Sequence, residues 1–103
     1  DATAEGLANV LQGYQAGTVF KDTSIEAKAA ADLAIAIING EDPTTIATGS
    51  VNDSELGVDV PSVLATPVWI TADTVQDVVT AGQASAADIC KGIEDLCSKY
   101  GVK

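Results

Sequence analysis

The stretch TVFKDTSIEAKAAADLAIAIING, residues 18–40, decides the fold because it joins a strand pattern directly to a helix pattern. Its first four residues are mostly β-branched or aromatic, which predicts a short strand. A capping box follows, in which the Thr23 hydroxyl and the Glu26 carboxylate satisfy each other's backbone amides. The alanine-rich run then ends at Asn39-Gly40, which supplies a left-handed stop. We therefore expect a strand followed by a helix of roughly four turns.

Apolar spacing predicts which faces of the N-terminal helices turn inward. The expected inward stripe of the alanine-rich helix consists of Ala30, Leu33, Ala34, Ile37 and Ile38. An earlier helix is expected within Asp1–Gly17, with Asp1 or Thr3 as its cap and Gly13 and Gly17 at its end. Its inward face consists of Leu7, Val10 and Leu11.

The middle of the chain alternates between turn-rich and β-like sequence. Glu41–Asp59 is polar and is predicted to be a surface loop, with one short strand near Thr45–Ala47. Val60–Thr71 is predicted to be a β segment interrupted by Pro61 and Pro67. Because proline removes a ladder donor, we expect this strand at a sheet edge or at a sharp turn.

The C-terminal part is predicted to be helical. Thr71–Thr80 forms a short helix with three valines inward, namely Val75, Val78 and Val79. Ser85 caps a last helical segment whose apolar stripe consists of Ile89, Ile93, Leu96 and Tyr100. Helices and strands that alternate in this way indicate an α/β fold. Only two strands are clear, fewer than a covered parallel sheet needs, so the chain is predicted to be part of a larger α/β protein.

Composition excludes several classes of function. The chain has 103 residues, 15 acidic and 5 basic side chains and a formal net charge of -10, which disfavours binding to nucleic acid. Hydrophobic residues make up 47%, enough for a core and too many for a disordered acidic tail. The absence of histidine removes the usual catalytic base and the commonest zinc ligand. With no nucleophile–base pair, we expect no enzyme and no cofactor, and the lack of methionine indicates a processed or truncated chain.

Cys90 and Cys97 leave two interpretations open. On an unbroken helix their spacing gives about 10.5 Å of rise, beyond the roughly 4.4–6.8 Å between Cα atoms that a disulfide tolerates. Gly92 lies between them and is able to break the helix. The pair is then either a disulfide staple in an exported protein or two reduced cysteines in the core. Two thiols without further ligands do not predict a zinc site.

Three other features have both a functional and a structural interpretation. Asp53, Glu55 and Asp59 offer oxygen ligands for calcium, but their spacing differs from the EF-hand pattern and favours a solvated loop. Asn52 begins an N-glycosylation sequon. Trp69 is either a packing residue or a platform on which a sugar ring stacks. No metal site is predicted from these residues.

Several stretches follow one another in a fixed order over nearly the whole chain. They are Asp1-Ala2, Val10–Gln15, Thr18–Asp22, Asn39–Glu41, Asp59–Leu64, Thr66–Val68, Ile70-Thr71, Asp77–Val79 and Ser85–Cys90. Together they resemble the C-terminal third of periplasmic-type sugar-binding proteins of ABC transporters. Among these, the xylose-binding and multiple-sugar-binding branch is the most similar.

The resemblance implies the C-terminal part of a two-lobed type I periplasmic-binding-protein fold, incomplete in this chain. Each lobe of that fold is a three-layer α/β/α sandwich, and three strands cross the hinge between the lobes. Residues 1–21 would belong to the second lobe up to the hinge. Residues 22–60 would form a helix and loop that pack on the first lobe. Residues 61–103 would form the returning hinge strand and the C-terminal helices.

The resemblance also implies a function. Asp1 and Lys21 occupy two positions that touch sugar in the family, so a monosaccharide would lie between the lobes and pass to an ABC transporter permease. The expected location is extracytoplasmic, in the periplasm or as a cell-surface lipoprotein. Expected partners are the rest of the two-lobed protein and, through uncovered apolar faces, a second copy. The alternative is a small autonomous exported interaction or structural domain with one disulfide, Cys90–Cys97.

Overall fold

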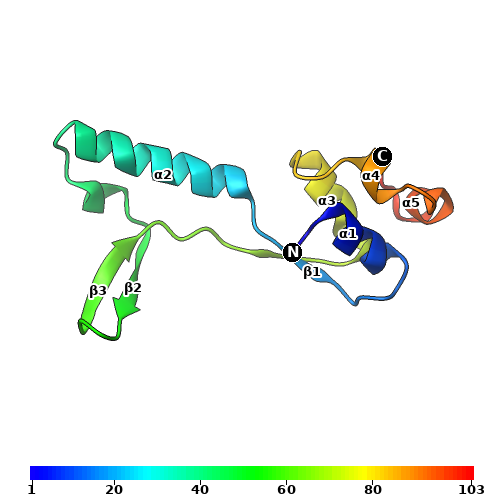
Figure 1. The fold of residues 1–103 in the computed structure, drawn as a ribbon, viewed down its shortest axis with the longest axis horizontal. Helices are drawn as coiled ribbons and strands as arrows, with labels where there is room; N and C mark the ends of the chain where they lie inside the picture. Colours follow the sequence, from blue (N-terminus) through cyan, green and yellow to red (C-terminus); the bar gives the residue numbers. More distant parts are fainter. The chain divides into compact units, whose positions relative to one another are not determined.

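The computed structural model describes residues 1–103 and has mixed α/β structure (Figure 1). The chain divides into two compact units. Unit 1 contains residues 1–22 and 67–103, and unit 2 contains residues 23–66. The division expected after residues 21 and 60 concerns the lobes of a larger protein and stays a prediction. No helix combines the length and the apolar character that crossing a membrane requires.

Unit 1 contains four α-helices, one 3₁₀-helix and two strands. Its elements are α1 (Ala4–Leu11), β1 (Thr18–Phe20), β4 (Val68–Ile70), η2 (Ala72–Thr74), α3 (Val75–Thr80), α4 (Ala86–Ile89) and α5 (Glu94–Tyr100). Unit 2 is smaller. Its elements are α2 (Thr23–Ile38), η1 (Pro43–Ile46), β2 (Gly49–Asp53) and β3 (Val58–Ser62).

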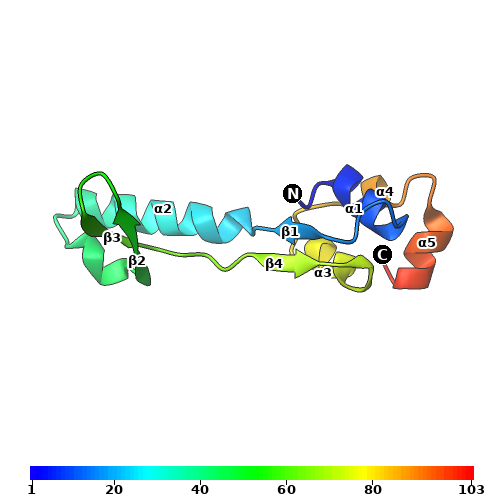
Figure 2. The ribbon, with the colours of Figure 1, turned by 90° about the horizontal axis from the view of Figure 1, so that it is seen from below.

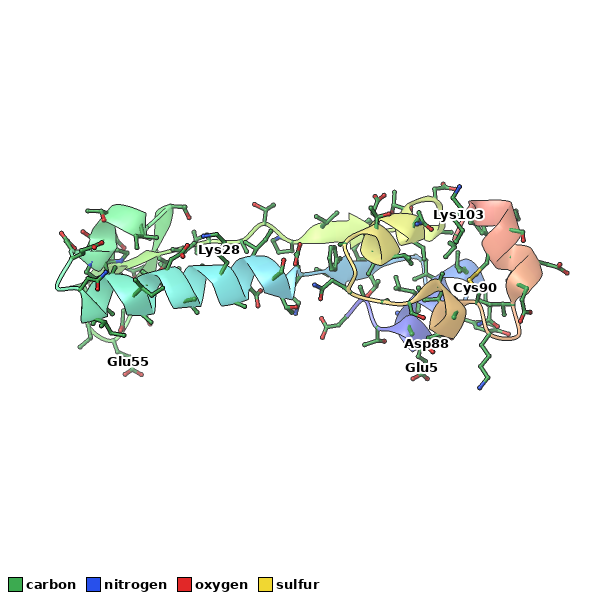
Figure 3. All side chains as sticks on the ribbon, turned by 90° about the horizontal axis from the view of Figure 1, so that it is seen from above. Glu5, Lys28, Glu55, Asp88, Cys90 and Lys103 are labelled. Carbon is green, nitrogen blue, oxygen red and sulfur yellow. A yellow bond between two sulfur atoms is a disulfide. The ribbon has the colours of Figure 1, made fainter.

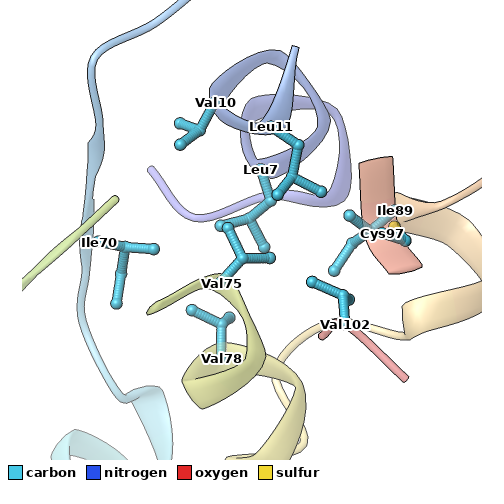
Figure 4. Close-up of a cluster of buried hydrophobic side chains, with 9 residues drawn as sticks. All are labelled: Leu7, Val10, Leu11, Ile70, Val75, Val78, Ile89, Cys97 and Val102. Carbon is cyan, nitrogen blue, oxygen red and sulfur yellow. The ribbon is translucent and has the colours of Figure 1, made fainter. Parts of the chain in front are cut away.

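The core of the protein lies in unit 1 (Figure 4). Side chains from four helices, β4 and the C-terminal residues meet there: Leu7, Val10, Leu11, Ile70, Val75, Val78, Ile89, Cys97 and Val102. The predicted inward face of α1 is therefore confirmed. Two of the three valines predicted to face inward on α3 are buried, and Val79 packs against the cluster while partly exposed.

The first helix is shorter than predicted. Thr3 is its cap, because its Oγ1 accepts a hydrogen bond from the Gly6 amide at 3.1 Å. The helix ends at Leu11 rather than near Gly17, and Gly13 follows with a φ of 79°. A glycine adopts that left-handed conformation without steric cost, so the first of the two predicted glycine stops ends the helix.

Strands β1 and β4 form an antiparallel ribbon in which Val19 lies opposite Trp69. Thr18 and Ile70 are buried on its inner face, whereas Val19 and Trp69 are exposed on the outer face. The β segment predicted over residues 60–71 with interruptions at Pro61 and Pro67 divides into β3 and β4, so the interruption at Pro67 is confirmed, whereas Pro61 lies within β3. The break includes Pro67, which has no amide hydrogen to donate to a ladder.

The predicted stripe over the last helical segment holds only in part. Ile89 is buried, and Ile93 and Tyr100 are partly buried and pack against the core, but the fully buried residue of the last helix is Cys97, which the stripe did not include. The reason is Gly92, whose φ of 78° separates α4 from α5, so that the stripe never lies on one continuous helix. Serine 85 caps α4 as predicted, accepting a hydrogen bond from the Asp88 amide.

Helix α2 ends as the sequence predicts. Gly40 has a φ of 73°, and the Glu41 amide donates to the Ala36 carbonyl at 2.8 Å. These features satisfy the last carbonyls of the helix. The helix begins at Thr23 itself, one residue earlier than a Thr23 N-cap requires.

The stripe predicted to face inward on α2 is mostly wrong. Ile37 and Ile38 are 63% and 82% exposed, and Ala36 is the buried residue of the helix. Apolar residues occur all round this helix, so their spacing alone does not select a face. Leu33 is the one residue of the predicted stripe that is partly buried, and Ala29, outside that stripe, is partly buried as well.

The predicted loop from Glu41 to Asp59 contains more structure than expected. The short strand predicted near residues 45–47 is a 3₁₀-helix, η1, capped by Asp42. The antiparallel hairpin of β2 and β3 follows, and Val51 lies opposite Val60 (Figure 2). The sequence pattern for this hairpin is weak, because polar residues and glycine surround the few valines that alternate along β2 and β3.

Candidate functional site

The structure brings Asp1 and Lys21 together in unit 1. The Lys21 ammonium nitrogen lies 3.0 Å from Oδ1 of Asp1. The side chains are 50% and 69% exposed, respectively. An exposed ion pair of this kind contributes about 0–1 kcal/mol to stability. Both groups therefore remain accessible to a polar ligand at little cost to the fold.

Each partner is positioned by the element next to it. Asp1 precedes α1, and its carbonyl oxygen accepts a hydrogen bond from the Thr3 amide at 2.8 Å. Lys21 directly follows β1, which is paired with β4. The two residues are twenty positions apart, and the packing of α1 beside β1 places them in contact.

A carboxylate and an ammonium group side by side offer complementary hydrogen-bonding groups. Asp1 only accepts hydrogen bonds, and Lys21 only donates them, up to three at a time. A hydroxyl group is both a donor and an acceptor, so it is able to bond to both at once. Hydrogen bonds to charged groups are shorter and stronger than those between neutral groups. The arrangement suits a small molecule rich in hydroxyl groups.

The loop after α3 adds a residue that sequence reasoning missed. Gln83 Nε2 donates to Asp22 Oδ1 at 3.4 Å, although 61 residues separate the two. Unit 1 also has a shallow hollow of about 580 Å³ with a mixed lining. Its lining residues are Ala4, Val79, Gly82, Gln83, Ala84, Ser85 and Asp88. No local pattern in the sequence pointed to Gln83, because its partner is known only from the fold.

The hollows of unit 2 have a different chemistry. Two of them, of about 390 and 210 Å³, share Leu33 and Val63. The lining of the larger hollow is mostly alanine, valine, leucine and isoleucine, with one carboxylate, that of Glu26. Such walls offer few partners to hydroxyl groups. These hollows therefore do not resemble the polar pair of unit 1.

In the structure, Cys90 and Cys97 form a disulfide with 5.8 Å between their Cα atoms. The glycine between them, Gly92, breaks the helix and lets the two cysteines approach. Figure 3 labels Cys90 at this bond, and the bond closes a small loop that joins α4 to α5. Cys97 of α5 belongs to the buried core, and the bond connects it to Cys90 at the end of α4, which packs against that core.

Trp69 has features of both interpretations that the sequence left open. Its indole ring lies against the backbone of Gly17, where an added Cβ atom would come within 2.5 Å of Trp69 Cζ2. The side chain is nevertheless 58% exposed. One side of the ring is therefore packed on Gly17, and much of the rest faces solvent.

The acidic residues of the hairpin have structural partners. Oδ1 of Asp53 accepts the amides of Glu55 and Leu56 in the turn, and Asp59 accepts the side-chain amide of Asn52 at 3.0 Å. The side chain of Glu55 projects from the backbone (Figure 3). No group of three or more histidine, cysteine, aspartate or glutamate side chains is arranged to hold a metal ion.

Two carboxyl groups have shifted pKa values, and both shifts arise from local capping. Hydrogen bonds from the Thr44 hydroxyl and then the Thr44 amide lower the pKa of Asp42. The amides of Glu94 itself and of Gly92 lower the pKa of Glu94. Neither group is part of the Asp1–Lys21 pair.

Two curated proteins are similar to the chain. The D-xylose-binding periplasmic protein of Escherichia coli (strain K12) is 33% identical over 82 residues, which cover 77% of this chain. The multiple sugar-binding periplasmic receptor ChvE of Rhizobium radiobacter is 32% identical over 92 residues, which cover 88% of it. No family model matches the chain, and no solved structure matches it.

The similarity extends over most of this chain but over a small part of each relative. The aligned residues are 23% of the xylose-binding protein and 25% of ChvE, so the chain spans about a quarter of the relatives it matches. Both relatives are sugar-binding proteins of the periplasm by name. The comparisons thus support a relationship to periplasmic sugar-binding proteins in general and do not select one branch.

Proposed function

We propose that the chain is the C-terminal part of an extracytoplasmic protein that binds a monosaccharide, and that it is not an enzyme. The observation that carries the proposal is the 3.0 Å contact between Asp1 and Lys21. It occurs in a chain similar to two periplasmic sugar-binding proteins. In this proposal, sugar hydroxyls replace the direct contact by donating to Asp1 and accepting from Lys21.

The complete protein would work by closure of two lobes. Residues 1–21 would belong to the second lobe, residues 22–60 would pack on the first, and residues 61–103 would return through the hinge. Sugar that contacts both lobes stabilises the closed form through its differential contacts, and an ABC transporter permease would recognise that form. The ligand would be xylose or one of several related monosaccharides.

An extracytoplasmic location fits the cysteine chemistry. Disulfides persist in the periplasm and on cell surfaces and are rare in the reducing cytosol. The bond between Cys90 and Cys97 would therefore survive where the two relatives are found. A soluble periplasmic form and a surface lipoprotein are both consistent with this chemistry.

The test is a sugar titration of the 103-residue chain, in which two-dimensional NMR spectra record the chemical shifts at each sugar concentration. D-xylose, D-glucose and D-galactose are each added to the parent and to Asp1→Asn, Lys21→Met and Lys28→Met. Because only one side of the cleft is present, we expect saturable shifts with a dissociation constant on the order of 1–10 mM. Both variants of the pair should lose the response.

Lys28→Met is the matched control, because Lys28 forms an exposed ion pair with Asp32 in α2. It also loses one lysine charge but should bind sugar like the parent. A chain that responds to none of the three sugars would contradict the proposal. So would a response that all three variants retain.

A second candidate function rests on the separate core of unit 1. That core and the disulfide would suit a small autonomous exported interaction or structural domain. Its signature is a cooperative thermal transition that is independent of protein concentration, together with no response to any sugar.

A further inference from the structure

Gly6 is an unexpected residue in the first turn of α1. It is not among the glycines with positive φ, so its backbone conformation does not require glycine. A glycine inside a helix costs about 1 kcal/mol relative to alanine. Some other feature of the structure must account for glycine at this position.

That feature is a close approach of backbone. A Cβ atom on Gly6 would lie 2.8 Å from the Asp1 carbonyl oxygen and 3.3 Å from Thr3 Oγ1. The Asp1 oxygen is also held by the Thr3 amide, and Thr3 Oγ1 is held by the Gly6 amide. Because the nearest atom is backbone in a hydrogen-bonded turn, it has little freedom to move aside.

We propose that Gly6 is a positioning residue for the Asp1–Lys21 pair. The missing side chain lets Asp1 fold back over the first turn of α1, where its carboxylate meets Lys21. This inference rests on the proposed sugar site, since it assigns Gly6 a role in presenting one ligand of that site. Gly6 acts through Asp1 and need not touch the sugar.

The position of Asp1 is sensitive to small displacements. Charged hydrogen bonds between nitrogen and oxygen have lengths of about 2.7–2.9 Å, and a contact at 3.6 Å no longer counts as one. The observed separation is 3.0 Å. Moving the Asp1 backbone away from a methyl group on Gly6 would therefore lengthen and weaken this contact.

The experiment compares Gly6→Ala with Ala8→Gly in the 103-residue chain. Gly6→Ala should weaken binding of D-xylose, measured by NMR titration, at least about fivefold, and should reduce the hydrogen-exchange protection of the Thr3 amide. Ala8→Gly introduces a glycine into the same helix away from Asp1. It should lower the midpoint of thermal unfolding and leave the xylose dissociation constant unchanged.

The outcomes separate this inference from the proposed function. A Gly6→Ala chain with parental xylose affinity and parental Thr3 protection would overturn the positioning role. If the parent binds no sugar, the proposed function fails. The role of Gly6 is then still decided by two signals, the hydrogen-exchange protection of the Thr3 amide and the nuclear Overhauser contact between Asp1 and Lys21. Loss of both signals in Gly6→Ala supports it, and retention of both overturns it.

The unmodified protein provides a check that needs no variant. A nuclear Overhauser contact should join the Gly6 Hα protons to protons of Asp1 or Ala2, and the Thr3 amide should exchange slowly. If Gly6→Ala fails to fold, these two signals decide the inference. Their absence from the parent would show that Asp1 does not lie over Gly6.

Discussion

At the scale of single residues, Leu7 shows what holds unit 1 together. Its side chain has no exposed surface, and it lies in the cluster that also contains Ile70 and Val75. Burial of a leucine side chain contributes roughly 1.5–3 kcal/mol through the hydrophobic effect. Residues of this kind, rather than the exposed ion pairs, stabilise the fold.

Replacing Leu7 with alanine should therefore be costly. We expect Leu7→Ala to lower the free energy of unfolding by about 2–5 kcal/mol, because it leaves a cavity in the core. Ile38→Ala is the control, since Ile38 is 82% exposed, and its effect should stay within about 0.5 kcal/mol. Urea unfolding, monitored by circular dichroism, measures the free energy of unfolding of both variants. Equal effects of the two substitutions would contradict this account of the core.

At the scale of elements, α4 and α5 are too short to be stable alone. They have four and seven residues, whereas isolated helices below about 12 residues are marginal in water. The Cys90–Cys97 bond closes a loop between them, and the Lys103 amide donates to Gln76 at 2.8 Å. These contacts hold the C-terminal helix on the core.

Removing the disulfide should destabilise the C-terminal region. For a loop of this length, the double variant Cys90→Ser, Cys97→Ser should lose about 2–3 kcal/mol of unfolding free energy. Urea unfolding of the parent with and without a dithiol reductant gives the same comparison without a mutation. Identical midpoints in all these samples would show that the bond does not hold α5 in place.

The η1 cap should depend on pH. Because Thr44 lowers the pKa of Asp42 below its ordinary value of 3.8, the cap stabilises the folded form above that value. This contribution is lost as the pH falls through the lower pKa of the folded state. Carbon-13 NMR of the Asp42 carboxyl group measures the pKa, and Thr44→Val should return it toward 3.8. An unchanged pKa in that variant would assign the shift to another cause.

At the scale of the whole molecule, buried and exposed apolar side chains are distributed unevenly. The core cluster lies in unit 1, and Ala36 is the one buried apolar residue of unit 2. Most exposed large apolar side chains lie in unit 2: Ile25, Ile35, Ile37, Ile38, Val51, Leu56, Val58, Val60 and Leu64. Unit 2 therefore presents more apolar surface than it covers.

Two consequences are measurable in the isolated chain. Backbone amides of unit 1 should exchange with solvent more slowly than those of unit 2, because exchange protection follows burial.

The chain should also self-associate as its concentration rises, and more strongly at high salt, because salt screens the repulsion between copies of net charge -10. Analytical ultracentrifugation of the parent and of Ile37→Lys, Ile38→Lys tests this. A monomer at all concentrations and salts would contradict it.

The local features of the fold could be predicted from the amino-acid sequence alone. The Asn39-Gly40 stop, the Ser85 cap and the buried face of α1 were all predicted correctly. Caps act over three or four residues, and helical periodicity acts over one or two turns, so a single segment contains the whole signal. The family resemblance implies that Asp1 and Lys21 bind sugar, and that role stays a prediction.

The tertiary structure was needed to find which residues from distant parts of the chain are in contact. It placed Lys21 beside Asp1 and Gln83 beside Asp22, and it paired β2 with β3. It also decided that α2 covers Ala36 and exposes Ile37. Such contacts depend on how distant segments pack, and where apolar residues surround a helix, as in α2, their spacing permits several faces. Packing against neighbouring segments then selects one of them.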